Sequence, residues 1–390
     1  MGLVEAEPLD KAHAPAPCRK REGGQLALYV HWPFCVSKCP YCDFNSHVRD
    51  SVDQEQWRKA LLLDLAYEAR QTAGLRLSSI FFGGGTPSLM PPATVAALIE
   101  AAERLWEFEP GIEITLEANP SSVEAGRFAD LAAAGVNRAS LGLQSLDDRA
   151  LRFLGRAHDA AEGLAALGAA QREFARVSFD LIYALPDQSE AAWQAELARA
   201  LALGTGHLSL YQLTIEPGTR FAALVAKGEL AAADPDRGAA LYELTQEMAE
   251  AAGVPAYEIS NHARPGEESR HNLTYWRYGA YAGVGPGAHG RRGGVFTRRY
   301  RKPENFLIAL DRNSHGIEEE SALAPDDSAV EALLMGLRLS EGVRLERVES
   351  ALDLRAVNEL EGRGLLALER GRLFVKRPLL LDAILAEIVR

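Results

Sequence analysis

The stretch Cys35-Val36-Ser37-Lys38-Cys39-Pro40-Tyr41-Cys42 places three cysteines within eight positions. A short apolar run, Leu26 to His31, precedes it and is predicted to be a strand, so the cysteines lie in a loop at the carboxyl end of that strand. Parallel α/β sheets and barrels carry their chemistry at this edge. Three thiolates in one loop can ligate three irons of a cubane cluster and leave the fourth iron open to another ligand.

Two other uses of these cysteines stay open from the residues alone. Zinc sites need four ligands, and His31 or His47 is close enough in sequence to complete one. Three free, buried thiols would need no metal. The chain has only one further cysteine, Cys18, in a Pro- and Ala-rich lead-in (1–24) that is predicted to be disordered, with Cys18 a bystander. Secreted disulfide proteins spread their cysteines in pairs, so a reducing, cytoplasmic location is expected.

Composition is that of an ordinary globular protein: 390 residues, 47% hydrophobic and 25% charged. The length allows one large domain and a smaller one. The net charge of −12 argues against broad nucleic-acid binding, which needs a dense positive surface. No run of about 18 apolar residues is present to span a membrane. The N-terminal segment has no apolar core of the kind found in secretory signals.

Apolar runs and helical patterns alternate along the first part of the chain. Strands are predicted at 26–31, 79–82, 112–117, 139–143, 177–182 and 207–213, and helices at 54–73, 94–105, 123–134, 160–174, 191–203 and 237–252. This alternation predicts a parallel sheet with helical crossovers. Six strand–helix units are fewer than the eight of a closed barrel, so the expected fold is α/β with a partial (β/α)6 barrel.

The remaining sequence changes character. A Gly- and Arg-rich segment, 261–320, is expected to connect the core, 25–260, to a mostly helical C-terminal domain, 321–390. In that domain, helices at 328–339, 345–351, 354–363 and 379–389 and a hairpin at 365–375 resemble a winged helix. A zinc protein that binds nucleic acid through this end is one hypothesis, but fold alone does not assign that function and the acidic charge disfavours it.

The cysteine loop resembles the signature of radical S-adenosylmethionine (SAM) enzymes, Cys-x3-Cys-x2-Cys with an aromatic residue, Tyr41, before the last cysteine. Tyr29-Val30-His31-Trp32-Pro33-Phe34-Cys35 and Phe82-Gly83-Gly84-Gly85-Thr86-Pro87 resemble the oxygen-independent coproporphyrinogen oxidase branch. Within that branch the chain, from about residue 26 to its end, is most similar to haem chaperones of the HemW type. The resemblance implies a [4Fe–4S] cluster on Cys35, Cys39 and Cys42, with SAM on its open iron.

The resemblance also implies SAM contacts on the predicted strands and in the segments that follow them, with Glu117 and Gln144 at strand ends and Asp180 within the fifth strand. Carboxylates suit the ammonium and ribose diol of SAM, and an arginine suits its carboxylate. The loop after the second strand would bind the amino group, since glycines let a backbone approach a ligand. Plain turns and sheet-capping residues are the alternative. The implied contacts are Tyr29, Tyr41, Gly84, Gly85, Thr86, Glu117, Gln144, Arg156 and Asp180.

Phe44 distinguishes two activities within the branch. Coproporphyrinogen dehydrogenases that resemble this chain carry a fourth cysteine at this position, whereas chaperone-type members carry phenylalanine. The resemblance therefore implies a haem chaperone that binds haem, the cluster and SAM and delivers haem to respiratory membrane enzymes, with peripheral membrane contact and a homodimer as further expectations. A radical SAM oxidase acting on a porphyrinogen is the alternative.

A second motif concerns haem itself. His271-Asn272-Leu273-Thr274-Tyr275-Trp276 resembles the HNxxYW motif of the haem-chaperone group, which makes His271 the expected haem ligand. A hydrogen-bonded structural histidine is the alternative for His271, and His207, His262 and His289 are alternative ligands. A basic cluster would attract haem propionates, dock an acidic partner or simply face solvent; it consists of Arg291, Arg292, Arg298, Arg299, Arg301 and Lys302.

Overall fold

A computed structural model describes residues 24–231 and 233–390 of the chain. The predicted disorder of the lead-in and the role of Cys18 concern residues outside these ranges. In the described part, no helix has the length and apolar character needed to cross a membrane.

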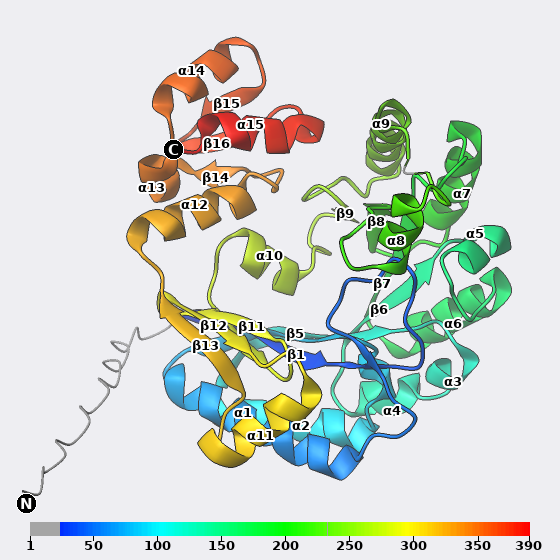
Figure 1. The fold of residues 1–390 in the computed structure, drawn as a ribbon, viewed down its shortest axis with the longest axis vertical. Coiled ribbons are helices and arrows are strands. Elements are labelled where there is room, and N and C mark those ends of the chain that lie inside the picture. Colours follow the sequence, from blue (N-terminus) through cyan, green and yellow to red (C-terminus); the bar gives the residue numbers. More distant parts are fainter. Residues whose placement is uncertain (1–23, 232) are drawn as a thin grey trace, which may run out of the picture.

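Six parallel strands form the centre of one large sheet (Figure 1). Each pairs with the next in sequence order, and the sheet is open, with edges at other strands. The predicted six-unit α/β fold is therefore confirmed. The strands are β1 (Gln25–Trp32), β4 (Arg76–Gly84), β5 (Glu107–Ala118), β6 (Arg138–Gln144), β7 (Arg176–Tyr183) and β8 (His207–Gln212).

Helices connect these strands, and several begin where a side chain caps the first turn. Asp53, Asp159 and Ser189 each accept a hydrogen bond from a backbone amide of the helix that follows. The predicted helix 123–134 is two short helices, because Gly126 and Arg127 interrupt it. The helices are α1 (Gln54–Gln71), α2 (Pro92–Leu105), α3 (Ser122–Ala125), α4 (Phe128–Ala133), α5 (Asp148–Phe153), α6 (Ala160–Glu173), α7 (Glu190–Ala202), α8 (Arg220–Ala226) and α9 (Pro235–Ala251).

The segment 261–320 was expected to be a connection, and this prediction is wrong, because the segment extends the sheet at both edges. The strand β10 pairs with β1 in parallel, on the edge opposite β4, and β11, β12 and β13 follow in antiparallel order. At the other edge β9 pairs with β8. The elements are β9 (Asn261–Ala263), α10 (Arg270–Trp276), β10 (Tyr281–Val284), β11 (His289–Arg292), β12 (Val295–Arg299), α11 (Pro303–Asn313) and β13 (Ile317–Ala322).

Buried ion pairs attach this extension to α1. Arg299 donates to Asp64 Oδ2 (3.1 Å) and Glu68 Oε1 (2.6 Å), and Arg292 donates to Glu68 Oε2 (2.8 Å). All four side chains are at most 7% exposed. The remaining lone pairs of Asp64 accept the amides of Gly285 and of a residue just before β13. The buried side chains of β11 and β12 therefore include arginines where apolar residues would be expected. For this reason a search for apolar patterns did not predict these strands.

The C-terminal residues form a smaller unit with its own core, which includes Leu333, Val348, Leu373 and Ile384. The predicted hairpin is present and is extended to three strands in the order β14-β16-β15. In Figure 1 this unit lies on the opposite side of the sheet from α1, α2 and α11. Its elements are α12 (Pro325–Gly336), β14 (Val343–Arg344), α13 (Leu345–Val348), α14 (Leu354–Gly362), β15 (Leu366–Glu369), β16 (Arg372–Val375) and α15 (Leu381–Ile388).

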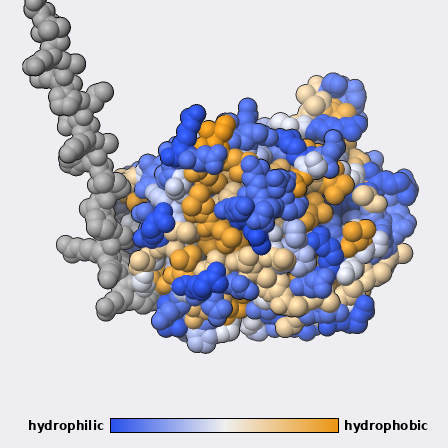
Figure 2. All heavy atoms as spheres, turned by 90° about the horizontal axis from the view of Figure 1, so that it is seen from below, coloured by the Kyte–Doolittle hydropathy of each residue, from blue (hydrophilic) through white to orange (hydrophobic). Residues whose placement is uncertain are grey.

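The face that α1, α2 and α11 cover is seen in Figure 2, where hydrophilic and hydrophobic side chains are interspersed. Leu63 of α1, Leu105 of α2 and Ile308 of α11 are the large apolar side chains that these helices expose. Single exposed apolar residues of this kind are normal on a protein surface. The functional groups lie elsewhere, at the carboxyl ends of the parallel strands.

The buried ion pairs predict a large loss of stability when one partner is removed. We expect Arg299→Met to lower the free energy of unfolding by about 3–5 kcal/mol, because Asp64 loses its only charged partner within the described residues. The urea midpoint of unfolding measures this. Arg298→Met is the matched control on the same strand: its side chain is 37% exposed and it should cost at most about 1 kcal/mol. Equal losses in the two variants would contradict the account.

Candidate functional site

The cysteine loop leaves the end of β1 and is closed by two short strands. β2 (Phe34–Cys35) pairs in parallel with β3 (His47–Val48), so the loop between them is held at both ends. Cys35, Cys39 and Cys42 are partly buried and are free thiols. Thr86 Oγ1 donates to Cys35 Sγ and Arg156 Nη1 to Cys39 Sγ, both at 3.4 Å. Burial raises the pKa of the Cys35 thiol, against the opposing hydrogen bond from Thr86, and burial also raises the pKa of the Cys42 thiol. Binding of a metal would require these thiols to lose their protons.

The zinc alternative lacks its fourth ligand. His31 Nε2 donates to the carbonyl of Asn45 (3.0 Å) and its Nδ1 accepts the hydroxyl of Tyr29 (2.9 Å), so both ring nitrogens are engaged. The imidazole of His47 contacts Asn45 Oδ1 at 3.3 Å. Across residues 24–231 and 233–390, no three His, Cys, Asp or Glu side chains converge where one metal ion could be held.

The glycine loop after β4 packs directly against the cysteine loop. Gly84 has φ +114°, and a Cβ there would lie 2.6 Å from the His31 ring; a Cβ at Gly85 would lie 2.7 Å from the carbonyl oxygen of Phe34. The amides of Gly85 and Thr86 donate to the carbonyls of Trp32 and Phe34. Only glycine permits this approach. The glycine loop therefore packs closely against the cysteine loop and is more than a plain turn.

Two carboxyl groups face the space between these loops. Burial, and then the neighbouring Asp180, raise the pKa of Glu117 to about 8, although the amide of Gly84 donates to it at 3.2 Å. Burial raises the pKa of Asp180 to about 6, against the opposing effects of Ser209 and Arg156. Acidic groups with raised pKa values in a cavity are typical of a site that is completed by a cation.

Arg156 and Gln144 complete this side of the site. Arg156 Nη2 donates to Asn119 Oδ1 (2.7 Å) and to the carbonyl of Gly142 (3.0 Å), while its buried Nε has no hydrogen-bond partner among the described residues. Gln144 has φ +70°, and the pairing of β6 with β7 shifts register just before it. A left-handed residue at a strand end costs energy and is common where a side chain is directed into a site.

These groups line one cavity of about 490 Å³, called here the cluster cavity. Its donor set suits a [4Fe–4S] cluster with SAM beside it, because three thiols lie with two carboxyls that would pair with the SAM cation and an arginine that would pair with its carboxylate. The sequence did not lead us to Asn119. It could have been found as a polar residue two positions after Glu117, at a strand end and before a proline. The predicted residues that line the cavity are Cys35, Cys39, Tyr41, Cys42, Gly84, Gly85, Thr86, Glu117, Gln144, Arg156 and Asp180.

Tyr29 is the one predicted SAM contact that does not line the cluster cavity. It lines a second cavity of about 520 Å³, called here the basic cavity, whose walls include Tyr275, His289, Arg298 and Arg301. Gly84 and Glu117 line both cavities. The two spaces therefore meet at the end of β4, beside the cysteine loop.

Phe44 lies where the cavities meet. Its side chain is 58% exposed, and it lines the cluster cavity, the basic cavity and a third cavity of about 640 Å³. An apolar ring therefore occupies a position between the cysteine loop and the neighbouring spaces, and it can bind no metal.

His271 is placed differently from the expectation of a haem ligand. Its ring is 1% exposed and lies 4.9 Å from the ring of Phe81, with Nδ1 at 3.1 Å from Ser79 Oγ and Nε2 at 2.7 Å from the hydroxyl of Tyr275. Burial lowers its pKa to about 3, so the ring is neutral. Because both nitrogens are engaged, none is free for iron, and the geometry is that of the structural alternative.

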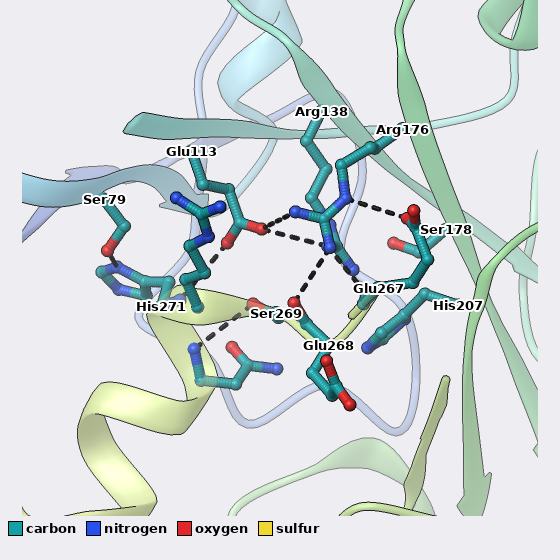
Figure 3. Close-up of polar contacts among 12 residues, drawn as sticks. Ser79, Glu113, Arg138, Arg176, Ser178, His207, Glu267, Glu268, Ser269 and His271 are labelled. Carbon is teal, nitrogen blue, oxygen red and sulfur yellow. Dashed lines mark hydrogen bonds and ion pairs between the residues drawn. The ribbon is translucent and has the colours of Figure 1, made fainter. Parts of the chain in front are cut away.

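A buried ion network that the sequence reasoning missed holds this motif in place (Figure 3). Glu113 accepts Arg138 Nη1 (3.1 Å) and Arg176 Nη1 (2.8 Å), and its other oxygen accepts the amide of His271 (3.3 Å). Arg176 also donates to Glu267, in the loop before α10. In the sequence, this network could have been suspected from the arginine that begins each of the apolar strands β6 and β7. The network ties α10 to three strands of the sheet.

Some of the other histidines and some residues of the basic cluster are buried, and the others are accessible to a ligand. His207 and His262 are buried, whereas His289 is exposed. The expectation of one basic cluster is wrong in part: Arg292 and Arg299 are in the buried ion pairs, and Arg291 is buried with its guanidinium 3.5 Å from the ring centre of Tyr278. The arginines of the cluster that line the basic cavity are Arg298 and Arg301.

Comparison with known proteins gives consistent matches over most of the chain. Residues 29–199 match the profile of the Radical SAM superfamily, and residues 323–378 match that of the HemN C-terminal domain. The mitochondrial radical S-adenosyl methionine domain-containing protein 1 of Bos taurus is 41% identical over 375 residues, which are 91% of this chain and 84% of that protein. The heme chaperone HemW of Escherichia coli is 38% identical over 328 residues, 81% of this chain and 83% of HemW.

A solved structure shares the fold. Coproporphyrinogen III oxidase (HemN) from Escherichia coli, a radical SAM enzyme, superposes with a TM-score of 0.81 over 95% of this chain and 91% of its own. The sequence identity is 23%, so this likeness concerns the fold alone.

The raised pKa of Glu117 predicts proton release when SAM binds. Between its ordinary value of 4.5 and about 8, the folded protein holds a proton that the unfolded chain loses, so rising pH destabilises the ligand-free fold. The SAM cation favours the ionised carboxyl, and we expect release of up to about one proton at pH 7 and almost none at pH 9.5. Calorimetry in buffers of different ionisation enthalpy measures this. Glu117→Gln should abolish the release, whereas Glu103→Gln, exposed on α2, should not; release that persists in Glu117→Gln would refute the assignment.

The close approach at Gly84 predicts a specific loss on adding one methyl group. Gly84→Ala and the control Gly74→Ala both place alanine at positive φ, which costs about 1–2 kcal/mol each. Only at Gly84 does the methyl meet the His31 ring; at Gly74 nothing lies within 4 Å. We therefore expect Gly84→Ala to lower the midpoint of thermal unfolding and the affinity for SAM far more than Gly74→Ala does. Similar behaviour of the two variants would argue against the packed loop contact.

Proposed function

This chain belongs to the radical SAM superfamily, in the group of the HemW haem chaperones and the mitochondrial radical SAM domain-containing protein 1, and from this we propose that it is a haem chaperone. Membership implies a [4Fe–4S] cluster and SAM. The observation that carries the finer proposal is Phe44: an apolar ring stands at the junction of the cavities, where the porphyrinogen dehydrogenases of this branch carry a further cysteine.

The chain's own residues have distinct roles in this proposal. Cys35, Cys39 and Cys42 hold the cluster, and Glu117 and Asp180 pair with the cationic end of SAM. A cluster bound by these cysteines would supply, when reduced, the electron for chemistry on SAM. Partial burial of the loop limits the access of water to the cluster.

Delivery of haem is the finer part of the proposal. Relatives named as haem chaperones are 37–38% identical to this chain over more than four fifths of their length, which supports haem as cargo. Respiratory membrane enzymes as recipients, peripheral membrane contact, a homodimer and a cytoplasmic location stay predictions. A porphyrinogen oxidase is the competing function.

Anaerobic reconstitution followed by haem titration tests the proposal. We expect the iron- and sulfide-reconstituted protein to bind one haem per chain, with a shifted Soret band, and to form no decarboxylated product from coproporphyrinogen III in the presence of SAM and reductant. Cys39→Ala should lose the cluster absorbance, and Cys18→Ser, which removes the cysteine outside the loop, should keep it. Turnover of the porphyrinogen without haem binding would contradict the chaperone and support the oxidase.

A further inference from the structure

We infer that haem binds in the basic cavity, with His289 as its iron ligand and with Arg298 and Arg301 paired to its propionates. This inference rests on the proposed haem-chaperone function and assigns residues to it. It differs from the expectation based on the HNxxYW-like motif, in which His271 was the ligand.

The basic cavity has walls suited to a porphyrin plane. Tyr29, Phe44, Tyr275 and Tyr281 line it, and the rings of Tyr275 and Tyr281 meet edge to face with centres 4.5 Å apart. Aromatic side chains supply apolar faces at low conformational cost. Its volume of about 520 Å³ is of the size of known cofactor pockets.

His289 is the imidazole of this cavity that is available to a ligand. His31, the other histidine in its wall, uses both ring nitrogens within the protein, as does the buried His271 behind it. His289 lies at the start of β11, is exposed, and packs edge to face on Phe296 with ring centres 5.6 Å apart. Partial burial and the nearby Arg298 and Arg301 lower its pKa, which keeps the ring in the neutral form that ligates metals.

Two arginines provide the matching charge for two propionates. Arg298 pairs with Glu318 (3.5 Å) and Glu319 (3.0 Å) at a half-exposed position, and these solvated pairs can exchange for a propionate at little cost. Arg301 is exposed, and its carbonyl accepts Asn45 Nδ2 at 3.0 Å, which fixes its backbone beside the cysteine loop. Arginine is well suited to carboxylates, because its donors form a planar fork.

The third cavity, of about 640 Å³, has the opposite chemistry. Its charged lining consists of Asp43, Asp180, Glu216 and Asp382 against Arg338, and it has no histidine. Propionates would meet repulsion there, and haem iron would find no imidazole. Among these spaces, charge and ligand type together favour the basic cavity.

This placement also gives the HNxxYW-like motif a role. His271 Nε2 engages the hydroxyl of Tyr275, and the ring of Tyr275 forms part of the cavity wall. His271 is therefore a positioning residue: its replacement should loosen the wall and weaken haem binding while the iron ligand stays the same.

Haem titration of reconstituted full-length variants tests the inference, with absorbance and electron paramagnetic resonance spectra as readouts. We expect His289→Gly to lose the imidazole-ligated spectrum and to bind haem at least about tenfold more weakly, and added free imidazole to restore the spectrum. His271→Gln should weaken binding but keep the wild-type spectrum. Arg298→Ala with Arg301→Ala should weaken binding severalfold with the ligand unchanged. His315→Ala, beside Tyr67 of α1, is the control and should match the wild type.

The outcomes separate this inference from the proposed function. A wild-type protein that binds no haem overturns both. Haem binding in which His289→Gly keeps the wild-type spectrum and affinity overturns the inference alone, and loss of the ligand spectrum in His271→Gln instead would return the ligand to the motif. Cluster absorbance and thermal midpoints close to wild type in each variant exclude misfolding as the cause.

Discussion

The parallel pairing of β1 on both of its edges determines where chemistry can take place in this chain. One edge pairs with β4 and the other with β10, and both neighbours run in the same direction as β1. The carboxyl ends of all three strands therefore meet where the cysteine loop begins. The pairing with β10 depends in turn on buried charge, because Asp64 and Glu68 of α1 bind the arginines of the following hairpin.

Two neighbouring spaces with different charged side chains result from this arrangement. On the β4 side, carboxyls with raised pKa values lie near three thiols and suit a cationic cofactor. On the β10 side, Arg298 and Arg301 line the same cavity as the exposed His289, and this combination suits an anionic ligand with a metal centre. The two share Gly84, Glu117 and Phe44, so ligands in them would lie next to each other. Such proximity offers a physical route by which one cofactor affects the handling of the other.

The sequence predicted the parts of this arrangement that follow local rules. Apolar runs located β1, β4, β5, β6, β7 and β8. The family resemblance, laid on these strands, implied Glu117, Gln144 and Asp180, and all three line the cluster cavity. The strands β10 to β12 were missed, because they are short and their buried residues include arginines paired with a helix more than 220 positions earlier. The motif around His271 was read as a ligand, whereas its hydrogen bonds to Ser79 and Tyr275 depend on contacts that no spacing reveals.

The most direct test of the account is a titration of haem into the reconstituted protein with and without saturating SAM. If haem and SAM occupy separate cavities, one haem should bind per chain in both cases. SAM should stay bound, and the affinity for haem should not fall in proportion to the SAM concentration. Competitive displacement of one by the other would contradict the account, because it would place both in the cluster cavity.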